Sequence, residues 1–186
     1  HMDALARESI FFTQGYISGN VCSPTRAGLM LGKYQQRVGV YTAGEGGSGF
    51  SLDEKIFPKY LQEAGYVSGA FGKWHLGLTP AYNPVNRGFD EFYGFMGRGA
   101  HDYYRLNDPE RPMYRNLVEI EDTGYLTNRL TEEAVDFIQR HKAEPFFLYL
   151  AYNAVHSPKQ APAEDIKKFD TGDPDRDILI AMLKHL

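Results

Sequence analysis

The sequence contains one cysteine, Cys22, among its 186 residues. A single thiol excludes a disulfide within the chain, and it excludes a zinc site built from several cysteines. A lone cysteine is usually a small buried hydrophobic residue. The segment Cys22-Ser-Pro24-Thr-Arg26 still needs an explanation of its own, because a helix is expected to begin there.

Long apolar runs and a large excess of one charge are also missing. No hydrophobic run approaches the length that crosses a membrane, so we expect no membrane span. The formal net charge is −4 and Lys and Arg are dispersed, which leaves no basic surface for nucleic acid. The start HMDALARES has no signal-peptide pattern, and we interpret residues 1–2 as a cloning remnant.

The residues that are present predict a globular α/β chain. Hydrophobic residues make up 42% and charged residues 24%, which is ordinary for a folded domain. The run PFFLYLAY is apolar on both faces, as a buried parallel strand should be, whereas residues 77–116 carry many turn formers and read as irregular. Ser23 is the expected N-cap of a helix that Pro24 opens. The predicted helices are 3–9, 24–34, 57–64, 126–141 and 175–186, and the predicted strands are 10–17, 66–72 and 145–152.

These elements alternate, which predicts a largely parallel central sheet flanked by helices. The length of 186 residues suits one domain or a large part of one. Because the chain begins in one helix and stops in another, we expect residues 3–186 to be a partial domain and the sheet to be incomplete.

Cys22 and Arg26 form the first segment with chemistry. If Pro24 opens a helix, Cys22 lies just before the N-terminus, where free N–H groups and the helix dipole favour an anion. Arg26 is one turn further along and can reach back to the same point. Such a place lowers the pKa of a thiol or holds an oxyanion. On these residues alone, a half-buried structural cysteine is the simpler interpretation.

A lysine and two histidines follow predicted buried strands. Lys73 and His75 lie in GKWHLG (72–77), and His156 lies in AYNAVHSP (151–158). Ligand sites of parallel sheets lie beyond the carboxyl ends of the strands, so both segments are well placed for a site. Taken singly, each side chain could also be a surface lysine or a histidine that is bonded to the backbone.

His101 and Asp102 form a polar pair in the aromatic segment RGFDEFYGFMGRGAHDYY (87–104). Aromatic loops more often pack than bind, but a polar pair between aromatic side chains could touch a ligand.

In this order, the segments resemble the sulfatase family of the alkaline-phosphatase-like superfamily. The family signature Cys-x-Pro-x-Arg, followed by small residues and Gly-Arg/Lys-Tyr, matches CSPTR and then AGLMLGKY. The second signature matches GKWHLG without a change. NRGFDEFYGF and PFFLYLAYNAVHSP are also similar to sulfatase sequences, so the resemblance spans nearly the whole chain.

The resemblance implies a role for each catalytic candidate. Cys22 would be oxidised to formylglycine, whose hydrated aldehyde attacks the sulfur of a sulfate ester. Arg26 would hold the hydrate, and Lys73 would neutralise sulfate oxygens. His75 would take a proton from the hydrate, and His156 would be the general acid on the leaving alcohol. His101 and Asp102 would face the substrate.

The resemblance also implies calcium, held by an Asp pair, an Asp-Asn pair and Cys22 as formylglycine. Both acidic pairs are absent from this sequence, as are the first strand and the C-terminal part of the family's domain. We therefore expect this chain alone to lack a complete metal site and to be inactive.

Three functions stay open at this point. The first is hydrolysis of a sulfated small molecule or glycan, after modification of Cys22 by a formylglycine-generating enzyme or an anaerobic maturase. The second is a phosphatase or phosphonate hydrolase of the same superfamily, and the third is a non-catalytic module that binds sulfated glycans. The family is mostly exported or lysosomal, so the resemblance implies a periplasmic, secreted or lysosomal protein.

Overall fold

The computed structural model describes residues 2–44, 49–97 and 101–186 of the chain. His1, half of the dipeptide interpreted as a cloning remnant, lies outside these ranges, as do residues 98–100 of the aromatic segment.

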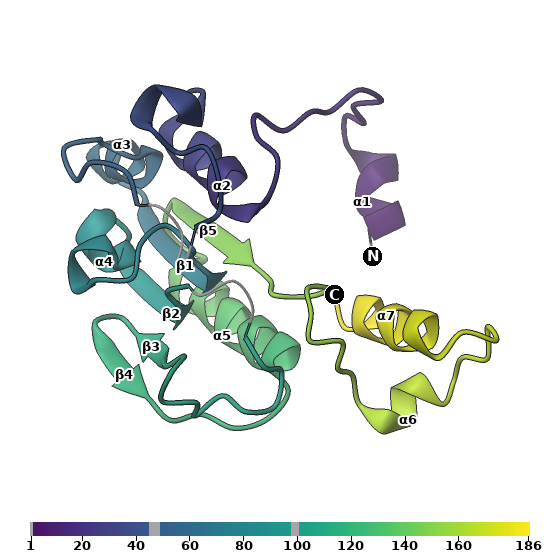
Figure 1. The fold of residues 1–186 in the computed structure, drawn as a ribbon. Coiled ribbons are helices and arrows are strands. Elements are labelled where there is room, and N and C mark those ends of the chain that lie inside the picture. The colour runs from purple at the N-terminus through teal and green to yellow at the C-terminus, as the bar shows by residue number, and fades with distance from the viewer. Residues whose placement is uncertain (1, 45–48, 98–100) are drawn as a thin grey trace.

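The strands of the described residues form one sheet, in the order β4-β3-β2-β1-β5 (Figure 1). Its centre is parallel: β1 (Val67–Lys73) pairs with β2 (Glu91–Phe95) on one side and with β5 (Phe146–Ala151) on the other. The antiparallel strands β3 (Met113–Arg115) and β4 (Val118–Ile120) extend it beyond β2. The parallel centre is as predicted, and the added hairpin makes the sheet mixed.

Helices pack against both faces of this sheet. Successive strand residues point to opposite faces, so each strand contributes side chains to two cores. Ala70 of β1 joins a core with side chains of α2 (Cys22–Leu31), while Phe71 joins a second core with side chains of α5 (Leu126–His141). Sequence periodicity predicts α5 correctly. The remaining helices are α1 (Met2–Glu8), α3 (Phe57–Glu63), α4 (Pro84–Arg87), α6 (Ala163–Ile166), α7 (Pro174–Lys184) and the 3-10 turns η1 (Gln35–Val38) and η2 (Pro80–Tyr82). No helix of the described residues is long and apolar enough to cross a membrane.

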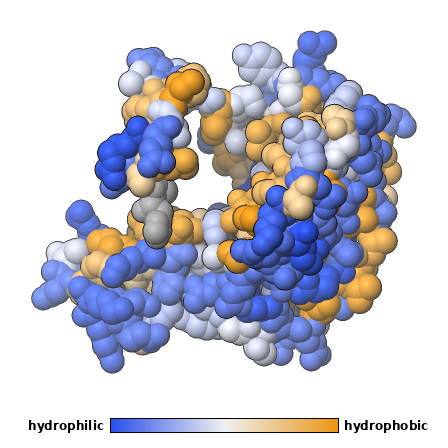
Figure 2. Space-filling view, turned by 180° about the vertical axis from the view of Figure 1, so that it is seen from behind, coloured by the Kyte–Doolittle hydropathy of each residue, from blue (hydrophilic) through white to orange (hydrophobic). Residues whose placement is uncertain are grey.

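The predicted strand 10–17 is wrong. These residues have no regular secondary structure and pair with no strand of the described residues, and Ile10, Phe11 and Phe12 are 84%, 72% and 77% exposed. The segment stands apart from the sheet in Figure 1, and Figure 2 shows the hollow that separates it from the body of the molecule. An apolar pattern makes a strand only where another strand pairs with it, and none does so within the described residues.

Three local predictions also need correction. Helix α2 begins at Cys22 after Val21, so Ser23 is not the N-cap; its hydroxyl instead donates to the carbonyl of His75 at 2.8 Å. Residues 77–116 are not irregular throughout, since they contain α4, β2 and β3. Strand β2 is short and contains Gly94, so its sequence resembles the turn-forming residues around it. The last helix, α7, ends at Lys184 rather than at the chain end.

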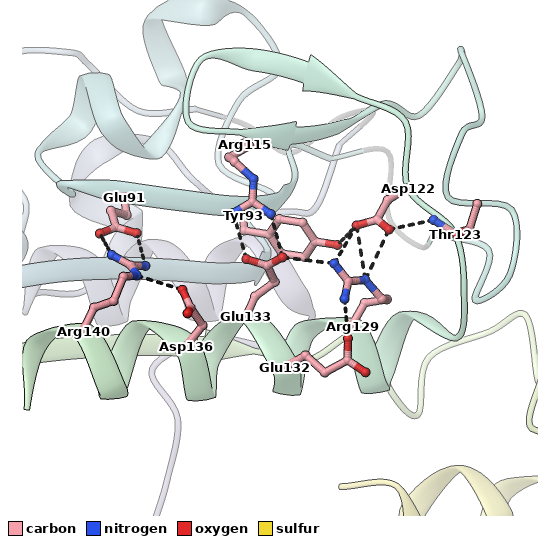
Figure 3. A network of polar contacts seen from close by, with 10 residues as sticks. All are labelled: Glu91, Tyr93, Arg115, Asp122, Thr123, Arg129, Glu132, Glu133, Asp136 and Arg140. Carbon is pink, nitrogen blue, oxygen red and sulfur yellow. Dashed lines mark hydrogen bonds and ion pairs between the residues drawn. The ribbon is translucent and has the colours of Figure 1, made fainter.

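Ion pairs and hydrogen bonds fix α5 against the sheet (Figure 3). Arg140 of α5 donates to both carboxylate oxygens of Glu91 on β2, at 2.6 and 2.7 Å. Arg115 of β3 forms a similar two-bond pair with Glu133 of α5, at 2.8 and 2.6 Å. Such bidentate pairs set orientation as well as adding energy. The network also includes Tyr93, Asp122, Thr123, Arg129, Glu132 and Asp136.

The three parallel strands approach closely at Gly72. This residue pairs with Gly94 of β2 and with Ala151 of β5. Its φ is +106°, and a Cβ atom there would lie 2.2 Å from the carbonyl oxygen of Ala151. Glycine is therefore required where the carboxyl ends of β1 and β5 meet.

We expect Gly72→Ala to lower the free energy of unfolding by more than about 3 kcal/mol, because backbone must move as well as adopt a strained φ. Gly65→Ala is the matched control: its φ is +82°, and nothing lies within 4 Å of the added Cβ. The control should cost only about 1 kcal/mol. Urea denaturation of both variants measures the difference, and equal losses would contradict the close approach at Gly72.

Candidate active site

The candidate residues meet beyond the carboxyl ends of β1 and β5. Lys73 is the last residue of β1 and His75 follows it, while His156 comes five residues after Ala151, the last residue of β5. The first turn of α2 brings Cys22 to the same place. This is the position at which parallel sheets bind ligands, and the structure brings the five catalytic candidates, Arg26 included, to it.

Helix α2 is fastened to the sheet by two polar side chains of its first turns. The Ser23 hydroxyl donates to the carbonyl of His75 at 2.8 Å and is buried. Nη1 of Arg26 donates to the carbonyl of Lys73 and, at 3.0 Å, to the hydroxyl of Tyr149 on β5. These bonds hold the first turn of α2 over the ends of two strands, so Cys22 has a fixed position relative to Lys73.

Lys73 is a buried cation beside the thiol. It is 3% exposed, whereas Cys22 is half-buried. Burial lowers the pKa of Lys73, the neighbouring Cys22 side chain opposes that shift, and the charge of Arg26 adds to it. An anion placed between these groups would remove the repulsion between Lys73 and Arg26 and favour the charged ammonium.

His75 is held in an unusual state. It is 2% exposed, its φ is +60°, and neither ring nitrogen has a partner among the described residues. Burial lowers its pKa to about 4, and the charges of Lys73, Arg26 and His156 act in the same direction. The ring is therefore neutral near pH 7 and can accept a proton. Buried polar atoms without partners are rare, and strained backbone clusters at functional sites.

His156 lies at the exposed rim of the same site. Its Nδ1 is 2.9 Å from the carbonyl oxygen of Ser157. Because a carbonyl only accepts, Nδ1 carries the hydrogen of this bond, and Nε2 is the ring nitrogen outside it. The backbone N–H of His156 donates to the carbonyl of Asn153 at 2.9 Å, which closes the turn after β5.

His101 is fully buried, away from solvent. Both of its ring nitrogens lie 2.7 Å from backbone carbonyl oxygens, those of Asp102 and Arg111. Its ring therefore already has two polar partners, which is the arrangement of a histidine bonded to the backbone. Contact between His101 and a substrate stays a prediction.

Asp102 organises the loop that contains it. One carboxylate oxygen accepts from the backbone N–H groups of Tyr104 and Arg105, both at 2.8 Å, and the other accepts from the Gln160 side chain at 2.9 Å. Burial opposes the ionisation of Asp102, but these hydrogen bonds and the nearby His101 outweigh it and lower its pKa. The role of Asp102 in substrate binding likewise stays a prediction.

Sequence reasoning missed three residues of this region. Tyr149 contacts Arg26, and its pKa is raised by burial against the opposing charge of Arg26. Asn153 is 3% exposed, donates to the carbonyl of His101 at 2.9 Å, and has an unpartnered Oδ1. Tyr103 donates to the carbonyl of His156 at 2.9 Å. Only Asn153 had a sequence signal, as a polar residue directly after an apolar strand.

The described residues do not fit a calcium site. Across residues 2–44, 49–97 and 101–186, no three His, Cys, Asp or Glu side chains gather in a group that could hold a metal ion. Calcium needs six to eight oxygen ligands, and Cys22 has no carboxylate neighbours of this kind in that part of the chain. No step below is routed through a metal.

The fold and the site together define an α/β protein in which Lys73, Arg26 and His75 converge at the N-terminus of a helix. Comparison with known proteins then gives the family, because the family model described as Sulfatase matches residues 1–179 of this chain. The chain belongs to the sulfatase family. The resemblance and the α/β fold class predicted from the sequence are confirmed.

Individual relatives are also sulfatases by name. "Uncharacterized sulfatase YdeN" of Escherichia coli (strain K12) is 36% identical, with 91% of this chain and 34% of that protein covered. N-acetylgalactosamine-6-sulfatase of Homo sapiens is 35% identical, with 87% and 35% covered. The chain thus spans about a third of the length of these relatives.

Solved structures share the fold. The crystal structure of Ps i-CgsB in complex with k-i-k-neocarrahexaose is 37% identical, has a TM-score of 0.82, and is covered over 43% of its chain by 91% of this one. The structure of BT4656 in complex with its substrate D-glucosamine-2-N,6-O-disulfate is 30% identical, has a TM-score of 0.75, and is covered over 32% by 90% of this chain.

Proposed function

We propose that the complete protein that carries this chain is a sulfuric ester hydrolase, with Cys22 as the precursor of its nucleophile. The observation that carries the proposal is the cluster around Cys22. Arg26, Lys73 and His75 converge there, and burial, with a further contribution from neighbouring positive charge, lowers the pKa values of Lys73 and His75. A buried group of this kind suits a ligand that is an anion, such as a sulfate ester.

We also propose that Cys22 is converted to formylglycine by a formylglycine-generating enzyme or an anaerobic maturase. When present, this group supplies the nucleophilic oxygen of its hydrated aldehyde. The surroundings fit it: residue 22 opens α2, is half-buried, and has the Lys73 ammonium as its neighbour. Arg26, fixed by Lys73 and Tyr149, would orient the group from one side.

The remaining side chains would bind charge and move protons. Lys73 would neutralise sulfate oxygens, and the charge of a bound sulfate would raise the pKa of His75 toward neutrality, making its ring a better base. As the bond between sulfur and the leaving oxygen breaks, Nε2 of His156 would give its proton to that oxygen. Proton transfer of this kind is worth about 10²–10⁴ in rate.

A sulfated saccharide is the proposed substrate. One relative is named N-acetylgalactosamine-6-sulfatase, and one structural neighbour contains D-glucosamine-2-N,6-O-disulfate. Family membership also supports calcium as a cofactor of the complete protein, with oxygen ligands from outside the described residues, and a periplasmic, secreted or lysosomal location. Because the described residues contain no group of side chains that could hold calcium, we propose that the 186-residue chain alone is inactive.

The test uses the complete protein, produced with and without a formylglycine-generating enzyme. Initial rates are measured with 4-nitrophenyl sulfate, 4-nitrophenyl phosphate and D-glucosamine 6-sulfate, and the peptide that contains Cys22 is analysed by mass spectrometry. We expect formylglycine at position 22 and a clear preference for sulfate esters. Preference for the phosphate ester would indicate a phosphatase instead, and an unmodified thiol with binding but no turnover would indicate a glycan-binding module.

A further inference from the structure

The loop that carries His156 rests on a buried tyrosine. Tyr103 is fully buried, and its hydroxyl donates to the backbone carbonyl of His156 at 2.9 Å. Its ring stacks on Tyr125 with the ring centroids 5.7 Å apart. Tyr103 and His156 are 53 positions apart in the sequence. The packed ring of Tyr103 therefore fixes the backbone carbonyl of a proposed catalytic residue.

Two further contacts join the same pair of loops. The side chain of Asn153, just after β5, donates to the carbonyl of His101 at 2.9 Å. Gln160 accepts from the backbone N–H of Tyr103 at 2.8 Å and donates to Asp102 at 2.9 Å. The segments 101–103 and 153–160 are thus connected at both ends, and the Tyr103 hydroxyl bonds to His156 between the ends of the second segment.

The connection leaves the His156 ring itself free to act. Among the described residues, the ring nitrogen Nδ1 bonds to the carbonyl of the adjacent Ser157, and His156 is exposed. Its direction is therefore set through the backbone, by the bond from Tyr103 at its carbonyl and the bond to Asn153 at its N–H. A small rotation of the backbone at His156 would move Nε2 away from the leaving oxygen of the substrate.

We propose that Tyr103 is a positioning residue for His156, which rests on the proposed function in that His156 is taken as the general acid. A displacement of about 1 Å at a reacting group can cost about 10²-fold in rate. Loss of one hydrogen bond from a packed ring is a smaller disturbance, so we expect an effect of about 10-fold. It should be confined to the step that needs the proton.

The test is Tyr103→Phe in the complete protein, assayed with two leaving groups. 4-Nitrophenolate leaves without a proton, whereas a sugar alkoxide needs one. We expect kcat for a sugar 6-sulfate to fall about 10-fold and kcat for 4-nitrophenyl sulfate to change less than about 2-fold. The KM values should stay near those of the unaltered protein, because Tyr103 is buried away from substrate.

Tyr104→Phe is the matched control. Tyr104 is the next residue, loses the same hydroxyl, and is 47% exposed. It should leave both substrates unaffected. In a His156→Ala background, where no acid remains to be positioned, Tyr103→Phe should have no further effect on the sugar 6-sulfate.

An equal loss for both substrates, or an undiminished loss in the His156→Ala background, would overturn the proposal and indicate a purely structural tyrosine. If His156→Ala lowers kcat less for the sugar 6-sulfate than for 4-nitrophenyl sulfate, the assignment of His156 as general acid fails, and Tyr103 then has no acid to position. A readout independent of activity is amide hydrogen exchange at His156, whose N–H bonds to Asn153. Tyr103→Phe should accelerate this exchange and Tyr104→Phe should not; unchanged exchange overturns the proposal even if no sulfate ester is hydrolysed.

Discussion

Replacing Lys73 by methionine should lower kcat/KM for sulfate esters by about 10²–10³-fold while raising the stability of the protein. The loss of activity follows from the position of the ammonium group, which lies beside Cys22 at the end of β1. Removal of one preorganised cation from a water-poor site typically has an effect of this size, because no water can replace it without reorganisation.

The gain in stability follows from the same surroundings. Lys73 is 3% exposed, and its pKa is lowered by burial and by the charge of Arg26, with only the Cys22 side chain opposing them. A buried cation with an unfavourable neighbour is costly, and a methionine side chain of similar length fills the same space without charge. We expect a gain of about 1 kcal/mol or more in the free energy of unfolding.

Kinetics and urea denaturation of the same preparation measure both effects. Lys167→Met serves as the control, because Lys167 is an exposed lysine at the end of α6. It should change neither quantity. A Lys73→Met protein that is both inactive and less stable would show that the lysine supports the fold, which would remove the reason for placing it in an anion site.

The candidate site could be predicted from the sequence because the prediction depends on local patterns. The apolar stripe Leu126, Leu130 and Phe137 recurs at helical spacing and predicts α5, and the run PFFLYLAY predicts β5. Since ligands bind beyond the carboxyl ends of parallel strands, the polar residues after β1 and β5 were natural candidates. Each of these inferences uses residues that are close in sequence.

The contacts that escaped prediction join distant segments. Arg26 and Tyr149 are 123 residues apart, and Ser23 bonds to a carbonyl 52 residues away rather than capping its own helix. The strand predicted at 10–17 failed for the opposite reason, because its local pattern was suitable but no partner strand lies beside it in the described part of the chain. Tertiary partners decide such cases, and a single sequence does not contain them.

His75 makes stability depend on pH in a window of its own. Its pKa is about 4 in the folded protein, against an ordinary value of 6.5. Between these values the unfolded chain binds a proton that the folded protein does not, so the free energy of unfolding falls as the pH falls. The difference corresponds to about 3 kcal/mol. Carboxylates contribute only at lower pH: the pKa of Glu91 is lowered by its hydrogen bond to Arg140, so its stabilising effect is lost below its ordinary value of 4.5.

His75→Asn should therefore remove most of the loss of stability between about pH 6.5 and about pH 4.5, because asparagine cannot be protonated there and tolerates the left-handed backbone at this position. Urea denaturation at several pH values measures the slope. His141→Asn is an informative control, since hydrogen bonding to Glu144 raises the pKa of His141. Its stabilising effect is present at low pH and disappears as the pH rises, so this substitution should steepen the acid loss. If His75→Asn leaves the slope unchanged, the pKa of His75 is the same in the folded and the unfolded protein, and burial beside Lys73 does not keep its ring neutral below about pH 6.5.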